Sequence, residues 1–492
     1  MKDHSRVVVV GNGMAAFRFV QDLAGLAPGL DIVVVGEEPG GAYNRARLPL
    51  VLAGAAAADS IELADPAWYA ARGARLTAGT AHRVDRAGRV LALADGRALP
   101  YDVLVLATGG ASVLPPVPGL AGGPAGASGG LPPGVVAFRT LADCRRIQSL
   151  AGTARNAVVL GGGVLGLETA RALAVRGLPV TLVQRGARLM ERQLDAPAGR
   201  VLARTARSLG VAVRTGAGVA AVRTARGRLT GVVLDDGTAL GTDLLVVCCG
   251  TRPRTDLARA AGLKVGAGVV VDDQLRSVSD PGVFAIGDCA EHGGRTHGLV
   301  AAAWAQAQTA ARAVAGLSTA DAGPRPGLAA PAVLRLKAAG IELAVLGAPS
   351  GGGGAEVIRF TDPVRGVYQK LVVRDGRLAG AILLGDTRTA GTLTQLLDRG
   401  AALPADRSSL LTARTAAAGA DGSPVTLPGH ATICQCNGVT KAAICAAWQE
   451  GARDAGQVSA RTRAATGCGT CRDAVEGIVA WLAAAEPGLV PA

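Results

Sequence analysis

The sequence predicts an α/β fold in which a strand–turn–helix unit occurs twice. Residues 7–16 read VVVVGNGMAA, so four β-branched residues run into a glycine turn and then into an apolar, helix-forming segment. Residues 156–167, NAVVLGGGVLGL, repeat this order. β-Branched runs favour buried strands, and glycines directly after such a strand favour a tight turn that opens a helix. Two such units in one chain are far more specific than either alone.

The first glycine turn predicts a binding site for a pyrophosphate. Gly11 permits the turn, Gly13 lets a diphosphate approach the backbone, and Met14 and Ala15 begin the helix. The exposed N–H groups and the helix dipole at such a position attract anions. Ala16 stands where a third glycine often stands and is small enough for close packing of helix and strand. A single GxGxxA match is also compatible with ordinary packing, so the rest of the chain has to decide.

The next strand supports a dinucleotide at this turn. Residues 32–35 form an apolar run that ends near Glu37. An acid at the end of the second strand, about 20 residues after the glycines, is placed to hold a ribose hydroxyl. Residues 101–109, YDVLVLATG, then predict another buried strand that ends in a turn at Thr108 and Gly109.

The second unit has the full GxGxxG spacing at Gly161, Gly163 and Gly166, and its helix is expected to begin at about Val164. The following strand, residues 179–183, leads into Gln184 and Arg185 rather than into an acid. An acid at this place favours NADH, whereas an arginine suits the 2′-phosphate of NADPH. The sequence therefore leaves the choice between the two coenzymes open.

Residues 283–288, VFAIGD, form a short apolar strand that stops at Asp288, and a helix is expected at 299–314. A carboxylate in this place suits a ribityl hydroxyl of a bound flavin nucleotide.

Several further elements follow from pattern alone. A helix is expected at 49–58, a linker at 318–331, and short strands at 334–386 with a hairpin turn at Asp375–Gly376. A helix at 391–399 and a flexible tether at 401–429 complete this part of the chain.

Composition excludes several classes of function. The chain has 492 residues, which suggests about three domains, and a net charge of +13. It has no basic cluster interleaved with aromatic residues, so nucleic-acid binding is not expected. No apolar run reaches the roughly 18–20 residues of a membrane span, and no signal-type segment opens the chain. We expect a cytoplasmic protein, in which nine cysteines argue against a disulfide framework.

The end of the sequence carries two cysteine pairs, Cys434-x-Cys436 and Cys468-x-x-Cys471. Glycines beside these residues free backbone N–H groups to point at sulfur. Four thiolates can hold either a structural zinc ion or a [2Fe–2S] cluster. The short CxC arm is less usual for zinc, and a flavin domain supplies a reason for iron, so the cluster is favoured over zinc.

Taken together, several stretches resemble a known family. They are AYNRARLP after Glu37, LATGG, GGGVLGLE, RLMERQLD, AIGDCA and CQCNGVTKAAI. Nearly the whole chain resembles the flavoprotein part of the bacterial assimilatory NAD(P)H nitrite reductase large subunit, and it is similar to the electron-transfer flavoprotein subunit of assimilatory nitrate reductase. The tail resembles the bacterioferritin-associated-ferredoxin (BFD) type of [2Fe–2S] domain.

This resemblance implies a glutathione-reductase-like flavoprotein of two dinucleotide-binding domains, with an α+β third domain and a small helical [2Fe–2S] domain. The implied FAD-binding domain comprises residues 1–120 and 256–320, and the NAD(P)H-binding domain comprises 135–255. The third domain is expected at 332–400 and the BFD-like domain at 431–490.

The resemblance also implies site residues by position. Those expected at FAD are Gly11, Gly13, Met14, Ala15, Glu37, Arg45, Thr108, Gly109 and Asp288. Those expected at NAD(P)H are Gly161, Gly163, Val164, Leu165, Gly166, Glu168, Gln184 and Arg185. The expected cluster ligands are Cys434, Cys436, Cys468 and Cys471.

Within this set, Arg45 is expected along the flavin, and Thr108 and Gly109 are expected to close over FAD. Glu168 is expected near the nicotinamide, with a helix-surface carboxylate as the alternative.

The other cysteines carry less information. The first domain has no CxxxxC, so the redox disulfide of glutathione-reductase-type enzymes is absent, and Cys144 stands alone. Cys248 and Cys249 are expected to pack as small apolar residues, as is Cys445 on a helix. Cys289 follows Asp288 and is expected to be an inert buried thiol rather than a group near the flavin.

Two histidines near the same strand, His292 and His297, are open to two interpretations. They could lie over the flavin edge, or they could be ordinary loop histidines.

The function that follows is an NAD(P)H-dependent FAD/[2Fe–2S] oxidoreductase. It takes a hydride from the nucleotide and passes single electrons to a separate catalytic subunit, with assimilatory nitrate reductase as the first choice and nitrite reductase as the second. The sirohaem half of the nitrite reductase large subunit has no counterpart in this sequence, so reduction of nitrite by this polypeptide itself is not expected. The alternatives are a ferredoxin or rubredoxin reductase and, in another class, a non-enzymatic module that binds an electron carrier.

Overall fold

The computed structural model describes residues 5–120, 130–318, 333–411, 425, 427–434, 437–465 and 471–485. The chain divides into two compact units. Unit 1 comprises Met1–Arg45, Ala57–Val113 and Thr251–Ala330, and unit 2 comprises Ala46–Ala56, Leu114–Gly250 and Pro331–Ala492.

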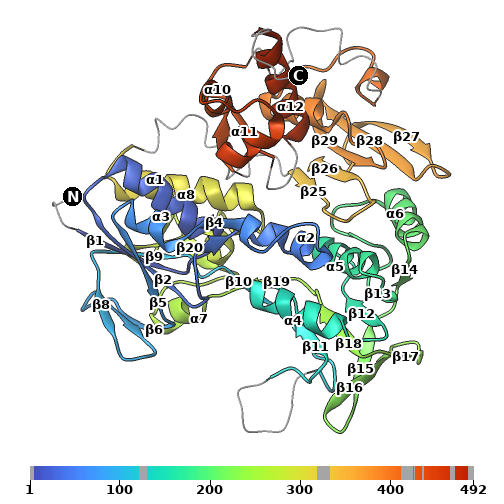
Figure 1. Ribbon diagram of the computed structural model, residues 1–492, viewed down its shortest axis with the longest axis horizontal. Coiled ribbons are helices and arrows are strands. Elements are labelled where there is room, and N and C mark those ends of the chain that lie inside the picture. Colours follow the sequence, from blue (N-terminus) through green and yellow to red (C-terminus); the bar gives the residue numbers. More distant parts are fainter. Residues whose placement is uncertain are drawn as a thin grey trace. The chain divides into compact units, whose positions relative to one another are not determined.

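Unit 1 is built on a twisted sheet whose central strands are parallel (Figure 1). These strands follow the order β22 (Asp280–Ala285), β9 (Val103–Leu106), β1 (Arg6–Val10), β2 (Asp31–Gly36) and β5 (Ala74–Ala78). Beyond β22 the sheet continues through β21 (Arg276–Ser277), β20 (Val269–Val271), β23 (Ala290–His292) and β24 (Arg295–Thr296).

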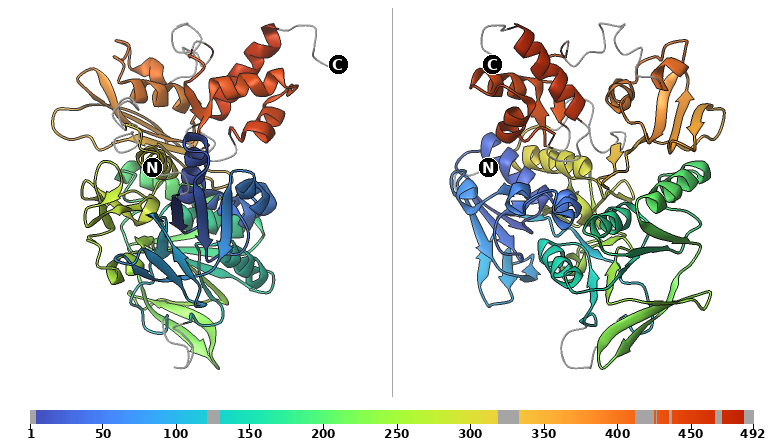
Figure 2. Two further views of the ribbon diagram at one scale, coloured as in Figure 1. Left: turned by 90° about the vertical axis from the view of Figure 1, so that its left-hand side faces the viewer. Right: turned by 45° about the vertical axis from the view of Figure 1, so that its right-hand side comes forward.

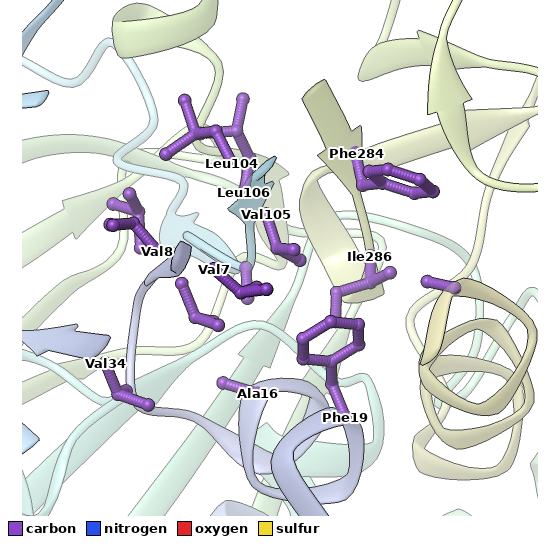
Figure 3. Close-up of a cluster of buried hydrophobic side chains, with 14 of the residues drawn as sticks. Val7, Val8, Ala16, Phe19, Val34, Leu104, Val105, Leu106, Phe284 and Ile286 are labelled. Atoms are coloured by element: carbon purple, nitrogen blue, oxygen red, sulfur yellow. The ribbon is translucent and has the colours of Figure 1, made fainter. Parts of the chain in front are cut away.

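Helices α1 (Met14–Leu26) and α8 (Val300–Val314) pack side by side in this unit. Figure 3 shows Ala16 and Phe19 projecting from α1 toward the strands that carry Val7 and Leu104. Val7 and Leu104 are fully buried, as are Ala16 and Phe19, because the β-branched strands are covered by apolar helix faces.

Smaller elements complete unit 1. They are β3 (Ala42–Tyr43), β4 (Glu62–Ala64), α3 (Pro66–Ala70), β6 (Ala81–Asp85), β7 (Val90–Leu93), β8 (Ala98–Pro100), β10 (Gly110–Ser112), β19 (Thr251–Pro253) and α7 (Asp256–Ala260), with short 3₁₀ turns at Asp59–Ile61 and Gly287–Cys289. A further 3₁₀ turn, Arg45–Arg47, spans the boundary where unit 1 passes into unit 2.

Unit 2 contains a second parallel sheet of the same type. Its order is β11 (Val135–Ala137), β18 (Leu244–Val247), β12 (Ala157–Leu160), β13 (Val180–Gln184) and β14 (Val211–Thr215). The accompanying elements are α2 (Leu48–Ala53), α4 (Leu141–Ala151), α5 (Val164–Val175), α6 (Ala196–Ser208), β15 (Val219–Ala225), β16 (Arg228–Leu234) and β17 (Ala239–Gly241). The predicted helix start at Val164 is confirmed.

An antiparallel sheet follows in unit 2, with α9 (Ala390–Arg399) packed against β29 and β26 (Figure 2). Its order is β25 (Val333–Arg335), β26 (Leu343–Gly347), β29 (Arg377–Leu384), β28 (Val367–Arg374) and β27 (Glu356–Asp362). The predicted hairpin joins β28 to β29, and both turn residues, Asp375 and Gly376, have positive φ, as a tight hairpin turn requires.

The last described elements are β30 (Thr432–Cys434), β31 (Val439–Thr440), α10 (Lys441–Gln449), α11 (Ala455–Thr462) and α12 (Arg472–Ala485). The three helices contact one another around the fully buried Ile444, Val458 and Ile478.

Two expectations need correction. The helix expected at 49–58 ends at Ala53, because Gly54 takes a left-handed conformation that stops it. The tether expected at 401–429 is wrong for its first part, since Leu403 and Leu411 are buried against the core of the antiparallel sheet. Burial of these two leucines is enough to fix residues 401–411 against the sheet, although the segment is otherwise polar. Residues 412–424 and 426, and the predicted linker from 319 onward, lie outside the described residues.

Candidate cofactor and nucleotide sites

The first glycine turn has the geometry that a diphosphate needs. Gly11 has φ +108°, and a Cβ placed on it would lie 2.2 Å from the backbone oxygen of Ala107, so only glycine fits. Gly13 is the N-cap of α1, and a Cβ there would meet no atom within 4 Å. The backbone at Gly13 is therefore open to a ligand at a helix N-terminus, which favours an anion.

The second turn repeats this geometry in unit 2. Gly161 has φ +111°, and its Cβ would lie 2.4 Å from the backbone oxygen of Cys248. Gly163 caps α5 and again faces open space. A Cβ on Gly166 would lie only 1.7 Å from the oxygen of Gly161, so α5 approaches its turn so closely that no side chain fits. Both turns can thus hold a pyrophosphate.

In unit 1 the structure gathers three predicted segments at the carboxyl ends of parallel strands. A Cβ on Gly287 would lie 3.0 Å from the Cβ of Ala15, so the loop carrying Asp288 abuts the start of α1. The Cys289 thiol donates to the oxygen of Leu106 at 3.3 Å, which ties that loop to the end of β9. Carboxyl ends of strands are where doubly wound sheets bind nucleotides.

Glu37 lies at the end of β2 and forms an ion pair of 3.0 Å with Arg254. Both side chains are about half exposed, so the pair contributes little to stability and Glu37 can exchange partners. Arg254 is held in place because its N–H donates to the oxygen of Gly109 and its own oxygen accepts the Thr108 hydroxyl. Sequence reasoning missed Arg254, since no local pattern marks it.

Two aromatic residues fix side chains beside the first turn. Tyr69 is fully buried, burial raises its pKa, and its hydroxyl donates to the Asn12 side chain at 2.5 Å. Arg45 stacks over the ring of Tyr43 and forms an ion pair with Glu38. The guanidinium thus has a defined orientation, and its place along the flavin stays a prediction.

At the edge of the second turn, Gln184 is turned back toward the glycines. Its Oε1 accepts the N–H of Gly162 at 2.7 Å. A Cβ on Gly186 would lie 1.9 Å from a carboxylate oxygen of Glu191. The Glu191 carboxylate, from a later loop, therefore lies close to the residues that follow β13. Arg185 has no hydrogen bond or ion pair with any residue that the structure describes.

Glu191 belongs to the motif RLMERQLD, in which no local pattern marks a role for its side chain. Its loop is held by the bond from the Met190 N–H to the oxygen of Gly162, and Glu191 pairs with Arg188 at 3.6 Å. The end of β13 therefore has the Glu191 carboxylate near it, together with the Arg185 guanidinium, which has no hydrogen bond or ion pair among the described residues.

Glu168 is only 4% exposed, so the alternative of a helix-surface carboxylate is wrong. Its carboxylate accepts the N–H of Lys337 at 2.7 Å, and Arg171 on the same helix donates to the oxygen of Ala339. Burial raises the pKa of Glu168, and the charge of Lys337 opposes that shift. A role near the nicotinamide stays a prediction.

The cysteines outside the tail are protected from reaction. Burial raises the pKa of Cys144 and Cys249 to about 11 and that of Cys248 to about 12. Cys289 is fully buried and its pKa is also raised. Protonated thiols are poor nucleophiles, which agrees with packing roles, although Cys249 is only partly buried where it packs against its core. The expectation that Cys445 is buried is wrong, because it is partly exposed on α10.

The two histidines have different surroundings. His292 lies on β23, with its Nε2 2.9 Å from a carboxylate oxygen of Asp273. Burial lowers the pKa of His297.

In the tail, Cys434 at the end of β30 and Cys471 are both buried. The Sγ of Cys471 accepts the N–H of Ala465 at 3.2 Å, and N–H bonds of this kind stabilise a metal-bound thiolate. Ala465 has φ +60°, and the Asn437 side chain bonds the oxygen of nearby Arg463. The other two predicted ligands, Cys436 and Cys468, lie outside the described residues, so the full ligand set stays a prediction.

None of the helices in the described ranges is long and apolar enough to cross a membrane.

Comparison with protein families gives three matches. Residues 5–313 match the pyridine nucleotide-disulphide oxidoreductase family. Residues 333–401 match the rubredoxin NAD⁺ reductase C-terminal domain, and residues 432–481 match the BFD-like [2Fe–2S] binding domain.

Among individual proteins, the chain is 33% identical over 478 residues to nitrite reductase [NAD(P)H] of Bacillus subtilis (strain 168), which covers 96% of this chain and 57% of that protein. It is 32% identical over 487 residues to the assimilatory nitrate reductase electron transfer subunit of the same organism, covering 98% of this chain and 60% of that one. The chain thus spans somewhat more than half the length of these two relatives. The crystal structure of the covalent putidaredoxin reductase–putidaredoxin complex is 28% identical, with a TM-score of 0.73 over 83% of this chain and 96% of that one.

The matched families imply FAD and NAD(P)H for the two glycine turns and a [2Fe–2S] cluster for the cysteine tail. The open backbone at Gly13 and Gly163 and the N–H bond to Cys471 fit these groups. The chain belongs to the pyridine nucleotide-disulphide oxidoreductase family.

Proposed function

We propose that this protein is an electron-transfer flavoprotein that oxidises NAD(P)H and reduces a separate catalytic partner, with assimilatory nitrate reductase as the first candidate and nitrite reductase as the second. The observation that carries the proposal is the combination of two open glycine turns of matching geometry with a BFD-like domain in one chain. The names of the two Bacillus subtilis relatives support the choice of partner.

The residues of unit 1 bind and orient FAD in this proposal. The N–H groups after Gly11 and Gly13 hold its diphosphate, and Glu37 holds a ribose hydroxyl. Asp288, whose loop abuts Ala15, holds the ribityl chain. When bound, FAD supplies the conversion between two-electron hydride chemistry and single-electron transfer.

The residues of unit 2 bind the pyridine nucleotide and the cluster. Gly161 and Gly163 hold the nucleotide pyrophosphate, and Gln184 keeps the turn in shape through Gly162. Cys471, with Cys434, Cys436 and Cys468, holds the cluster, which supplies a one-electron carrier when bound. The buried thiols of Cys248 and Cys289 stay protonated and take no part.

Reconstitution tests the proposal. The purified protein is mixed with NADH or NADPH and with the molybdenum-containing catalytic subunit of assimilatory nitrate reductase, and loss of nitrate is measured against nucleotide oxidation. We expect nitrate-dependent oxidation in a fixed ratio. The matched control is Cys471→Ser, which should keep NAD(P)H oxidation with ferricyanide but lose nitrate reduction. A wild-type protein that reduces ferricyanide but never nitrate would contradict the choice of partner.

A second candidate function is reduction of a separate ferredoxin, favoured by the likeness to the putidaredoxin reductase complex over most of the chain. The same Cys471→Ser variant separates the two. If it reduces an added [2Fe–2S] ferredoxin as fast as the wild type, electrons reach the ferredoxin without passing through the cluster of the cysteine tail. That result favours a ferredoxin reductase.

A further inference from the structure

A buried glutamine on α8 has only half of its amide satisfied. Gln306 is 1% exposed, and its Oε1 accepts the N–H of Gly287 at 2.8 Å. Its Nε2 is buried and has no hydrogen-bond partner among the described residues. A buried donor without an acceptor is rare in native proteins, because it loses its bonds to water and gains none in return.

The orientation of this amide is fixed by chemistry. The N–H of Gly287 is a donor, so the atom facing it has to be the carbonyl oxygen of Gln306. Flipping the amide would place two donors against each other and leave the oxygen without a donor. The N–H groups of Nε2 therefore face away from Gly287 and need an acceptor that the described residues do not supply.

The place of Gln306 indicates what that acceptor is. Gly287 has φ +76°, lies against Ala15 in the first turn of α1, and directly precedes Asp288. Gln306 therefore holds the loop that abuts the first glycine turn. The neighbouring helix positions Ala307, Ala310 and Ala311 are fully buried and apolar, so they offer no side-chain acceptor. FAD, which the family implies at this turn, is rich in acceptor oxygens.

We propose that Gln306 is an FAD-positioning residue. Its Oε1 holds the Gly287–Asp288 turn in shape, and its Nε2 donates a hydrogen bond to an oxygen of bound FAD. The inference rests on FAD binding in the proposed function and is independent of the electron acceptor.

The sharpest test is Gln306→Glu. This substitution keeps the shape and the oxygen that accepts from Gly287, but it replaces the N–H donors of Nε2 by a carboxyl oxygen, which accepts and cannot donate once it is ionised. Gln308→Glu is the matched control, because Gln308 is exposed on the same helix. The readouts are the FAD dissociation constant from titration of the apoprotein, the melting temperature of the apoprotein and the flavin absorption spectrum of the holoprotein.

We expect Gln306→Glu to weaken FAD binding by about tenfold or more, as loss of one buried hydrogen bond to a polar or charged group does. Because the introduced carboxylate is buried, the melting temperature of this apoprotein should also fall, so the structure of the wild-type holoprotein described below separates a contact with FAD from a loss of stability. Gln308→Glu should change neither quantity. A Gln306→Glu protein with wild-type FAD affinity and an unchanged flavin spectrum would overturn the inference.

A crystal structure of the wild-type holoprotein gives a test that needs no variant. An FAD oxygen within hydrogen-bond distance of Nε2 supports the inference, and a water or an empty space there overturns it. The two proposals fail differently. Wild-type protein that binds no FAD would contradict the proposed function, whereas unchanged binding in Gln306→Glu would contradict only the role of Gln306.

Discussion

The two glycine turns are nearly identical in backbone and different in almost everything that surrounds them. Gly11 and Gly161 share a φ close to +110° and the same close approach to a neighbouring strand. The turn of unit 1 is held by Asn12 and Tyr69, whereas that of unit 2 is held by Gln184. The backbone conformation of each turn is therefore set by its own glycines. The side chains that hydrogen-bond to the turn differ, because they come from other segments of each unit.

The ribose edges differ in the same way. In unit 1 the acid follows β2 directly, as Glu37, and pairs with Arg254 from far along the chain. In unit 2 the position after β13 holds an amide, and a carboxylate arrives from the later residue Glu191. Charge at this edge distinguishes a 2′-hydroxyl from a 2′-phosphate on the bound ribose, so the two units can differ in this contact although they share the same backbone.

The largest loss of stability and of nucleotide binding is expected when the first glycine of either turn is replaced. Gly11→Ala and Gly161→Ala each force a Cβ to within about 2.4 Å of a backbone oxygen at positive φ. We expect each to destabilise its unit by about 3 kcal/mol or more. Gly11→Ala should lose FAD, and Gly161→Ala should lose NAD(P)H binding while keeping FAD. Flavin content and urea unfolding measure this, and equal loss of FAD in both variants would break the comparison.

The third position of the glycine motif, Gly166 in unit 2 and Ala16 in unit 1, should respond differently to substitution in the two units. Gly166→Ala places a Cβ 1.7 Å from the oxygen of Gly161, so backbone has to move, and a loss of about 2 kcal/mol or more is expected. Ala16→Gly, the mirror change in unit 1, only removes a buried methyl group and should cost about 1 kcal/mol. Unfolding free energies of the two variants test this. A neutral Gly166→Ala would mean that α5 can move away from its turn.

The edge charges should set coenzyme preference. Arg185→Ala removes a guanidinium that has no partner among the described residues and lies beside the predicted ribose site, so kcat/KM for NADPH should fall relative to that for NADH by about tenfold. Glu191→Gln removes a carboxylate and should shift the ratio the other way, by less. Steady-state kinetics with both coenzymes and ferricyanide give the ratio. An Arg185→Ala protein with an unchanged ratio would place the 2′-position elsewhere.

The smallest effect concerns the buried carboxylate of α5. Burial raises the pKa of Glu168 above the ordinary 4.5, so its protonated form is the one that favours folding. That contribution is complete below pH 4.5 and is lost as the pH rises through the raised value. Glu168→Gln should therefore become more stable relative to the wild type between pH 5 and pH 8.

Melting temperatures across that pH range give the comparison. Gln can still accept the Lys337 N–H, and Glu191→Gln, on a partly exposed side chain of the same unit, serves as the control. A difference between Glu168→Gln and wild type that does not change with pH would show that Glu168 stays in one protonation state throughout.

Sequence by itself determined the β-branched strands beside the two glycine turns, the turns themselves and the start of α5. These follow from neighbouring residues, because φ limits, β-branched runs and helix capping act over only a few positions. Sequence also gave the spacing of the tail cysteines, whose pairs are local. It failed at residues 401–411, where burial of Leu403 and Leu411 depends on a sheet formed elsewhere in the chain.

Only the tertiary structure decided which side chains serve these turns. Arg254 meets Glu37 across a separation of 217 residues, and Tyr69 meets Asn12 across 57. Gln306 reaches Gly287 because α8 packs beside α1, a contact that no local pattern encodes. Backbone shape is fixed by energies within a few residues, whereas partners for polar groups depend on which distant segments the hydrophobic core brings together.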